Sequence, residues 1–210
     1  GGRDLEAGGS WLALSGRGRL AAVTNVRRMA QPLPGAPSRG ALVADFVRGE
    51  ARAADAAVAL LDRAPAYAGF NLLLWDGDTL EYVSNRPTPR HTTLPPGVYG
   101  LSNDALDTPW PKLLRLRAAM QAVADGARHI YTLFTALADP RPAADAEMPN
   151  TGVGAPMERL LSSPSIRDAR YGTRASTVVT VPAHGAARLV ERRFGPEGRP
   201  LGESTLEAPQ

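Results

Sequence analysis

The sequence has 210 residues, with no cysteine, 24 lysine or arginine residues and 21 aspartate or glutamate residues. This length fits one domain or two very small ones, and a hydrophobic fraction of 43% is ordinary for a globular protein. The lack of cysteine excludes a disulfide framework, a thiolate zinc site and a cysteine nucleophile within these residues. No apolar run approaches the roughly 18 residues that would span a bilayer, and the first residues lack the apolar core of a signal peptide.

The charge balance is basic but weakly so. The pI is near 9.7 and the net charge is +3, and Lys112 is the single lysine among the 24 basic residues. The basic doublets at 27–28 and 192–193 stand alone, without the aromatic-interleaved basic stripe of a nucleic-acid surface. We therefore expect no nucleic-acid partner.

The first half of the chain predicts two pairs of strands separated by two helices. A glycine-supported turn at 15–18 joins two apolar runs, and Ser38 and Gly49 have the residue types that start and stop a helix. A short strand is also expected at 98–101, and His91 is expected in a proline-rich loop. The predicted strands are 11–14, 20–24, 70–75 and 79–84, and the predicted helices are 38–49 and 55–63.

The second half predicts a helix pair followed by another hairpin. The first helix begins at Pro111, where a missing N–H costs least, and ends near Gly126. The chain from 139 to 165 is rich in proline, alanine and glycine, which is typical of a functional or mobile cover, with one helical turn at 157–161. The remaining predicted elements are a helix at 127–138, strands at 176–181 and 188–194, and a weak strand at 203–206.

Strand pairs therefore alternate with helix pairs. Parallel crossovers would alternate single elements, so the order favours an α+β fold of antiparallel sheets covered by antiparallel helices. No linker or internal repeat divides the sequence, and we expect residues 1–210 to form a single domain that includes the 139–165 loop.

The sequence gives little support for a nucleotide site, a metal site or a serine nucleophile. Gly16, Gly18 and Ala21 match a loose dinucleotide fingerprint, but they lie between two strands instead of opening a helix. The three histidines are too scattered to form a metal site, although one axial haem ligand stays possible. The sequence also contains no Gly-x-Ser-x-Gly nucleophile elbow.

Polar residues at strand ends are the candidate site residues. Asn25 closes one apolar strand, Asn103 follows another, and Arg174 opens a third. Asparagine in such a place can satisfy a turn, or its N–H groups can stabilise a developing oxyanion. An arginine at a strand start can hold a carboxylate or phosphate through two hydrogen bonds. Trp110, between two prolines, is expected to pack instead of taking part in chemistry.

These blocks closely resemble the NRDE family, also called the transport and Golgi organisation protein 2 family. The similar segments occur in family order across nearly the whole chain. They are 2–4 (GRD), 8–12 (GGSWL), 20–25 (LAAVTN), 38–43 (SRGALV), 69–73 (GFNLL), 99–103 (YGLSN), 106–112 (LDTPWPK) and 171–177 (YGTRAST). The family's N-terminal cysteine and its Asn-Arg-Asp-Glu motif do not occur here, so we expect this chain to be N-terminally truncated.

The resemblance implies a four-layer αββα sandwich similar to that of N-terminal-nucleophile hydrolases. In the branch that resembles bile-salt hydrolases, an N-terminal cysteine attacks an amide and later asparagines line the oxyanion site. By order and local context, Asn25, Asn103 and Arg174 correspond to the later residues of that set. The nucleophile would lie upstream of Gly1.

Two functions follow from the resemblance. The first is a cytoplasmic carrier that binds or traffics haem or a related amphipathic molecule, such as an acyl-CoA or a lipid-like compound, with haem as a possible bound ligand. The second is an amidohydrolase that uses the upstream cysteine, with Asn25 and Asn103 stabilising the oxyanion. The family favours the carrier narrowly, and the sequence determines neither the ligand nor the oligomeric state.

Overall fold

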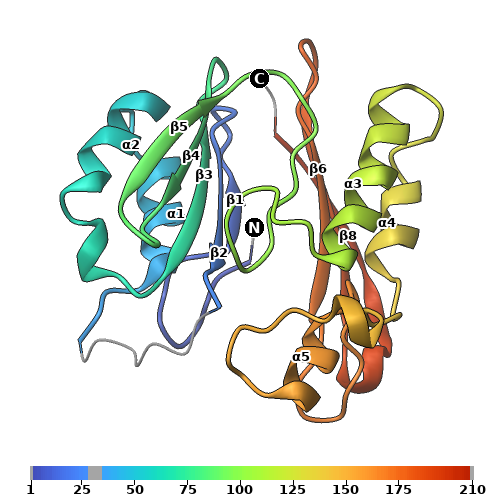
Figure 1. The fold of residues 1–210 in the computed structure, drawn as a ribbon. Helices are drawn as coiled ribbons and strands as arrows, with labels where there is room; N and C mark the ends of the chain where they lie inside the picture. Colours follow the sequence, from blue (N-terminus) through green and yellow to red (C-terminus); the bar gives the residue numbers. More distant parts are fainter. Residues whose placement is uncertain (1, 28–34, 209–210) are drawn as a thin grey trace.

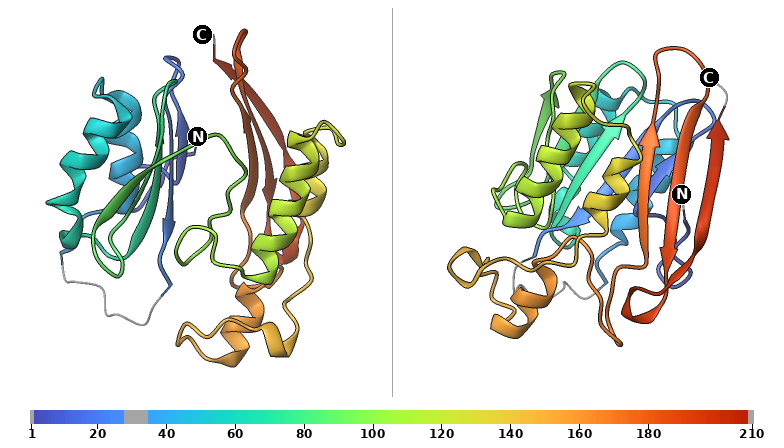
Figure 2. Two further views of the ribbon diagram at one scale, coloured as in Figure 1. Left: turned by 45° about the horizontal axis from the view of Figure 1, so that its top comes forward. Right: turned by 90° about the vertical axis from the view of Figure 1, so that its right-hand side faces the viewer.

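The computed structural model describes residues 2–27 and 35–208, which form two antiparallel sheets and their covering helices. Figures 1 and 2 show four layers in the order helices, sheet, sheet, helices. Helices α1 and α2 lie outside the first sheet, and α3 and α4 lie outside the second. The predicted α+β class and antiparallel sheets are confirmed.

The first sheet has five strands in chain order, from β1 at one edge to β5 at the other. The predicted first hairpin is confirmed, because Leu12 pairs with Ala22 and Leu14 pairs with Leu20 across the turn. The predicted second hairpin is also confirmed, with Leu73 opposite Tyr82. The strands are β1 (Leu12–Leu14), β2 (Leu20–Asn25), β3 (Phe70–Trp75), β4 (Leu80–Ser84) and β5 (Arg90–Leu94).

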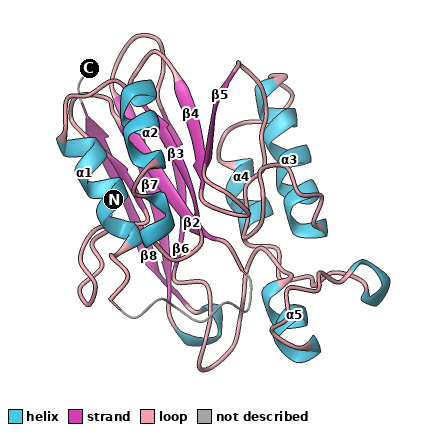
Figure 3. Ribbon diagram, turned by 60° about the vertical axis from the view of Figure 1, so that its left-hand side comes forward, coloured by secondary structure: helices cyan, strands magenta, loops and turns pink. Residues whose placement is uncertain are grey.

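Two helices cover the outer face of this sheet, α1 (Arg39–Arg48) and α2 (Ala53–Leu61), followed by a 3₁₀ turn at Ala64–Ala66. Figure 3 shows both helices lying across the strands. Leu42 and Val43 lie four and three residues before Phe46, so the three side chains share one face of α1, and they belong to the same apolar core as Phe70 and Leu72. This is the larger of the two apolar cores formed by the described residues.

Two expectations around β5 are wrong. His91 lies in strand β5, where it pairs with Val83 of β4, and not in a loop. The β-branched residues at 92 and 93 favour an extended backbone, and Thr93 donates a hydrogen bond to the buried carboxylate of Glu81 (2.9 Å). Residues 98–101 form no strand, because the N–H of Gly100 bonds instead to the Asp107 side chain (2.8 Å).

The second sheet has three strands in the order β6–β7–β8. Its predicted hairpin is confirmed, with Val178 opposite Val190, and the weak predicted strand is a full edge strand of nine residues. Val178 and Val190 pack on Phe134 of α4 in the smaller core. The elements are α3 (Pro111–Ala124), α4 (Thr132–Leu137), β6 (Ala175–Thr180), β7 (Ala187–Phe194), a 3₁₀ turn at Pro196–Gly198 and β8 (Pro200–Ala208).

Helix α4 begins five residues later than expected. Gly126 has a positive φ of 71°, and the N–H of Arg128 bonds back to the carbonyl of Ala122, so the chain turns sharply after α3. The imidazole of His129 then stacks on the Tyr131 ring with centroids 5.3 Å apart. The 127–131 segment is therefore a turn that leads into the helix.

The 139–165 segment contains a 3₁₀ turn at Asp145–Glu147 and helix α5 (Ala155–Leu161), which is longer than the single turn predicted. Figure 1 shows α5 below the second sheet. In the part of the chain that the structure describes, no helix is long and apolar enough to cross a membrane.

The connection from β5 to α3, residues 95–110, passes between the two sheets (Figure 1). It carries the Tyr99–Asn103 block of the sequence, and it brings that block to the end of β2. This crossing positions the candidate site.

Candidate functional site

The end of strand β2 is bonded to the connection that crosses between the sheets. The Thr24 hydroxyl donates to the carbonyl of Ser102 (2.7 Å), and the Asn103 amide donates to the carbonyl of Asn25 (3.0 Å). The backbone N–H of Arg27 donates to the Asn103 carbonyl (2.7 Å). Asn25 and Asn103, 78 residues apart in sequence, therefore lie together.

A buried asparagine of strand β3 supports this arrangement. Asn71 is fully buried and donates to the carbonyl of Asp104 (2.8 Å) and to the Thr24 hydroxyl (3.3 Å). Its own carbonyl accepts the Tyr82 hydroxyl (2.8 Å). Since both ends of the amide are satisfied, the connection is held firmly against the sheet.

The side chain of Asn25 itself is unsatisfied. Its Oδ1 atom is buried and has no hydrogen-bond partner among the residues that the structure describes. A buried polar atom without a partner is costly, and such atoms often occur where a ligand or water completes the bonding.

Arg174 makes no hydrogen bond to Asn25 or Asn103 in the described part of the chain. It is exposed just before β6, and its carbonyl accepts the N–H of Phe194 (2.8 Å). Within residues 2–27 and 35–208, its guanidinium makes no hydrogen bond or ion pair. Tyr171, from the same sequence block, interacts electrostatically with Arg27. The structure thus joins two of the three predicted site residues by a hydrogen bond and leaves Arg174 without one.

Asn103 also belongs to a group of three charged residues and two uncharged ones, which we call the Arg27 cluster. It is formed by Arg27, Lys112, Glu158, Asn103 and Trp110. One guanidinium nitrogen of Arg27 is 3.3 Å from the Glu158 carboxylate, and another donates to the Asn103 side chain (3.2 Å). The guanidinium carbon of Arg27 and the ammonium of Lys112 lie 5.2 and 5.6 Å from the Trp110 ring centre. These are cation–π distances.

Burial shapes the charges of this cluster. Burial lowers the pKa of Arg27, against the opposing effect of Glu158. Burial also lowers the pKa of Lys112 to about 8, and the positive charge of Arg27 adds to this effect while Glu158 opposes it. Burial acts to raise the pKa of Glu158, but hydrogen bonds from Thr151 and the charge of Arg27 outweigh it, so the net pKa is lowered.

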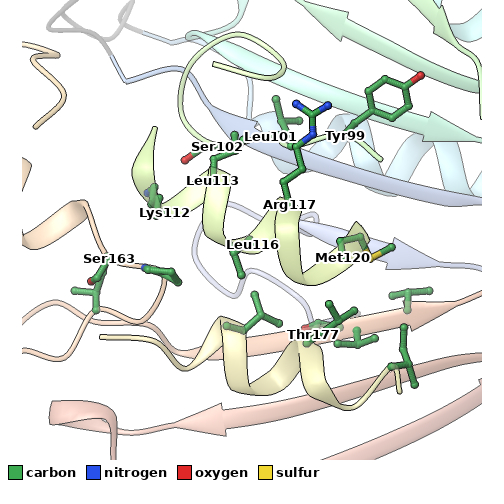
Figure 4. A pocket seen from close by; sticks show the side chains of 18 residues that line it. Tyr99, Leu101, Ser102, Lys112, Leu113, Leu116, Arg117, Met120, Ser163 and Thr177 are labelled. Atoms are coloured by element: carbon green, nitrogen blue, oxygen red, sulfur yellow. The ribbon is translucent and has the colours of Figure 1, made fainter. Parts of the chain in front are cut away.

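Lys112 also lines a cavity of about 450 Å³, which we call the α3–α4 cavity. Figure 4 shows Lys112 and Ser163 at one end, Met120 at the other and Leu116 between them. The wall is mostly apolar, and it contains two cations and no acidic side chain. It is formed by Tyr99, Gly100, Leu101, Ser102, Lys112, Leu113, Leu116, Arg117, Met120, Ile130, Leu133, Leu137, Ser163, Pro164, Ile166, Thr177, Val178 and Val179.

The described residues contain no group of three or more histidine, aspartate or glutamate side chains placed to hold a metal ion. His91 lies 3.3 Å from the buried carboxylate of Glu81 on the first sheet. None of the three histidines contributes to the wall of the α3–α4 cavity as the structure describes it.

Sequence reasoning did not identify the Arg27 cluster. In the sequence, Arg27 belongs to a basic doublet, Lys112 is the single lysine and closes the 106–112 block, and Glu158 belongs to no pattern. Two signals point to the cluster: Arg27 stands two residues after Asn25, and Lys112 follows Trp110 by two residues. Glu158 gave no signal, because its burial depends on how α5 packs.

The comparisons with known proteins agree on one family. The family model described as Transport and Golgi organisation 2 matches residues 1–196. The chain is 34% identical to "Transport and Golgi organization 2 homolog" of Mus musculus over 208 residues, which is 91% of this chain and 75% of that protein. It is 33% and 31% identical to "Transport and Golgi organization protein 2 homolog" of Bos taurus and Homo sapiens, with the same coverage. The chain therefore belongs to the Transport and Golgi organisation 2 family.

Proposed function

We propose that this protein binds an amphipathic organic anion in the α3–α4 cavity. One observation carries the proposal: a mostly apolar wall holds two cations, Lys112 and Arg117, and no acidic side chain among its described residues. Its volume of about 450 Å³ lies in the range of small-molecule sites, which are typically apolar with a few placed polar groups.

Of the two cations, Lys112 is the stronger anchor for an anionic headgroup. Arg117 is exposed and already lies 3.4 Å from the Asp107 carboxylate, so solvent and a counter-charge weaken its pull on a ligand. Lys112 is more buried, and its positive charge is poorly compensated there. A ligand anion at Lys112 would offset that cost while the tail of the ligand lies along Leu116.

Haem and acyl compounds both fit this chemistry. Haem has carboxylates on an apolar ring, and the cavity wall includes Met120, a side-chain type that ligates haem iron in proteins. A fatty acid or acyl-CoA needs only the cation and the apolar wall. The relatives are named for transport and Golgi organisation, and we propose that the binding serves trafficking of such a molecule in the cytoplasm.

Titration with several ligands tests the proposal. Haem, oleate, palmitoyl-CoA and oleyl alcohol would be added to the full chain, with the fluorescence of its three tryptophans and the haem absorbance as readouts. We expect saturable one-to-one binding of at least one anion and weaker binding of the uncharged alcohol. Leu116→Trp should abolish binding by filling the middle of the cavity, whereas Leu201→Trp on exposed β8 should not. Failure of every anion to saturate would overturn the proposal.

A second candidate function is an amidohydrolase with its nucleophile upstream of Gly1. The adjacency of Asn25 and Asn103, whose side chains both carry N–H groups, supports it. In this mechanism an upstream cysteine attacks the amide carbonyl and the asparagines bind the oxyanion, each worth on the order of 3 kcal/mol. Arg174 would hold the substrate's carboxylate, since its guanidinium is uncommitted.

A thiol-reactive probe tests the hydrolase directly. A version of the protein that carries the family's N-terminal cysteine would be treated with an active-site-directed probe at neutral pH. We expect fast labelling of that cysteine, slowed by Asn103→Ala but not by Asn150→Ala on the exposed 139–165 loop. A cysteine that reacts no faster than a free thiol would contradict this second function.

A further inference from the structure

Lys112 has three properties that binding an anionic headgroup does not require. It is the single lysine of the chain, its ammonium is partly buried beside another cation, and its side chain lines an apolar cavity. Its one hydrogen bond among the described residues is donated to the carbonyl of Leu161 at the end of α5 (3.0 Å). A neutral amine can also donate that bond, so the contact does not need the positive charge.

No carboxylate holds Lys112 in its charged form by direct contact in the described part of the chain. The nearby carboxylate of Glu158 is bonded to Arg27 and to both the backbone and the hydroxyl of Thr151. Arg27 lies against the same Trp110 ring as Lys112 and opposes its charge. Burial and this neighbour keep the pKa of Lys112 at about 8, so part of the amine is neutral near pH 7.

We infer that Lys112 is a covalent binding site for apolar aldehydes, which form an imine with its amine inside the α3–α4 cavity. This inference rests on the proposed function, because the tail of the aldehyde would occupy the same apolar wall as an amphipathic anion. The reactive carbonyl would lie at the Lys112 end, beside Ser102 and Ser163, with the tail directed along Leu116 toward Met120 (Figure 4).

The reaction is balanced without any further reagent. The lone pair of the Lys112 amine forms a bond to the carbonyl carbon, and the carbonyl π electrons move to oxygen, which takes up a proton as nitrogen loses one. The resulting hydroxyl leaves as water after a second protonation, while the nitrogen lone pair forms the C=N bond of an iminium ion, which then releases the proton on nitrogen to give the imine. An aldehyde and an amine thus give an imine and water.

The Ser102 hydroxyl is suited to assist the first step. It lines the cavity, and its oxygen Oγ has no hydrogen-bond partner among residues 2–27 and 35–208, whereas the Ser102 carbonyl accepts the Thr24 hydroxyl. A free hydroxyl can donate to the carbonyl oxygen as negative charge develops on it. Ser163, by contrast, already donates to the carbonyl of Ser165 (3.0 Å).

Reductive trapping tests the inference, and the single lysine makes the readout simple. The full chain would be incubated with decanal and sodium cyanoborohydride at neutral pH, and then cleaved after arginine. Residues 91–115 form the peptide that contains Lys112, and the α-amino group of Gly1 is an internal reference amine. We expect the Lys112 peptide to gain decanal at least about tenfold faster than Gly1, because the cavity concentrates the reactants.

Three controls separate a cavity reaction from chance modification. Propanal, which has the same carbonyl but almost no tail, should show no preference for Lys112. Leu116→Trp should reduce the adduct to the level of Gly1 while the fold is kept, as circular dichroism would show. Ser102→Ala should slow trapping, whereas Ser165→Ala, outside the cavity wall, should leave it unchanged.

The outcomes distinguish this inference from the proposed function. Equal labelling of Gly1 and Lys112, or equal rates for decanal and propanal, would overturn the inference. If decanoate binds in a parallel titration and decanal gives no Lys112 adduct, the inference fails and the binding function stands. If decanoate and every other anion fail to bind, the proposed function fails, and a tail-dependent Lys112 adduct would then support the covalent site alone.

Discussion

At the scale of single residues, the placement of Lys112 lowers the stability of the folded state. A charged ammonium is held in a partly buried place next to Arg27, and burial and that charge lower its pKa from 10.5 to about 8. Structural roles alone do not favour such a placement, because an apolar residue would pack there at lower cost. The position is better explained by a ligand that meets the ammonium or its neutral amine.

The lowered pKa predicts a pH dependence of stability. Above pH 8 the folded protein releases the Lys112 proton, while the unfolded chain keeps it until about pH 10.5, so the unfolded state binds more protons in this window. The free energy of unfolding should therefore rise from pH 8 to 10.5 relative to Lys112→Met, which lacks the group. Urea unfolding of both proteins at several pH values measures the difference. A constant difference across the window would show that the folded pKa is not lowered.

Asn25 and Asn103 show what sequence can predict at this scale. Both are at the ends of apolar runs, so a shared site could be expected, and the structure joins them by a hydrogen bond. The Arg27 cluster could not be expected in the same way. Whether Lys112 and Glu158 are buried depends on how α3 and α5 pack, and neither residue differs locally from an ordinary surface charge.

At the scale of elements, α5 is attached to the end of β2 by one buried ion pair. Glu158 is 3% exposed and bonds to Arg27 and Thr151. Glu158→Ala should lower the free energy of unfolding by about 3 kcal/mol, because it leaves Arg27 buried without its counter-charge. Glu147→Ala, on an exposed turn of the same segment, should change it little. Urea titration compares the two, and similar losses would mean that the ion pair does not hold α5.

The contact between the N-terminal segment and α1 depends on two glycines. A Cβ on Gly9 would lie 2.2 Å from the carbonyl carbon of Gly40, and Gly9 also has a φ of +78°. Gly9→Ala should therefore destabilise the fold by about 2 kcal/mol or more, through strain and a backbone clash. Gly16→Ala is the matched control, since a Cβ there meets nothing within 4 Å and φ is ordinary. Thermal unfolding compares the two variants, and equal stability would refute the close contact between Gly9 and Gly40.

The elements were predicted best where apolar periodicity was strong. The three hairpins and the helices α1 and α3 follow their predicted bounds closely, because a single sheet or helix face supplies the signal. Strand β5 was missed because its polar threonines and flanking prolines resemble a loop, and its pairing with β4 came from tertiary context. Helix α4 was predicted too long because the turn after Gly126 has no distinct sequence signal.

At the scale of the whole molecule, the two sheets share one connection. Residues 95–110 cross between them, bond to β2 and β3, and then enter α3, so the first sheet fixes the wall of a cavity that the second sheet and its helices complete (Figures 1 and 4). A substitution of Asn71 on the first sheet would for this reason change the position of Ser102 in the cavity wall. Family membership rests on residues 1–196, whereas the proposed ligand would be held at this one site.

Another hollow on the molecule is one alternative binding site for an amphipathic anion. A groove of about 260 Å³ lies between α1 and α2, and its wall mixes acidic and basic side chains, including Asp45, Glu50 and Arg63. Its mixed charge favours no anion. An amphipathic anion should therefore choose the α3–α4 cavity, with cations alone on its wall.

Photoaffinity labelling tests this choice most directly. A long-chain fatty acid with a diazirine in its tail would be bound to the full chain and irradiated, and the labelled peptides would be mapped by mass spectrometry. We predict labels on α3, α4 and β6, lost with excess oleate and lost in Leu116→Trp. Labels confined to the α1–α2 groove, or spread over the surface and insensitive to Leu116→Trp, would contradict the account.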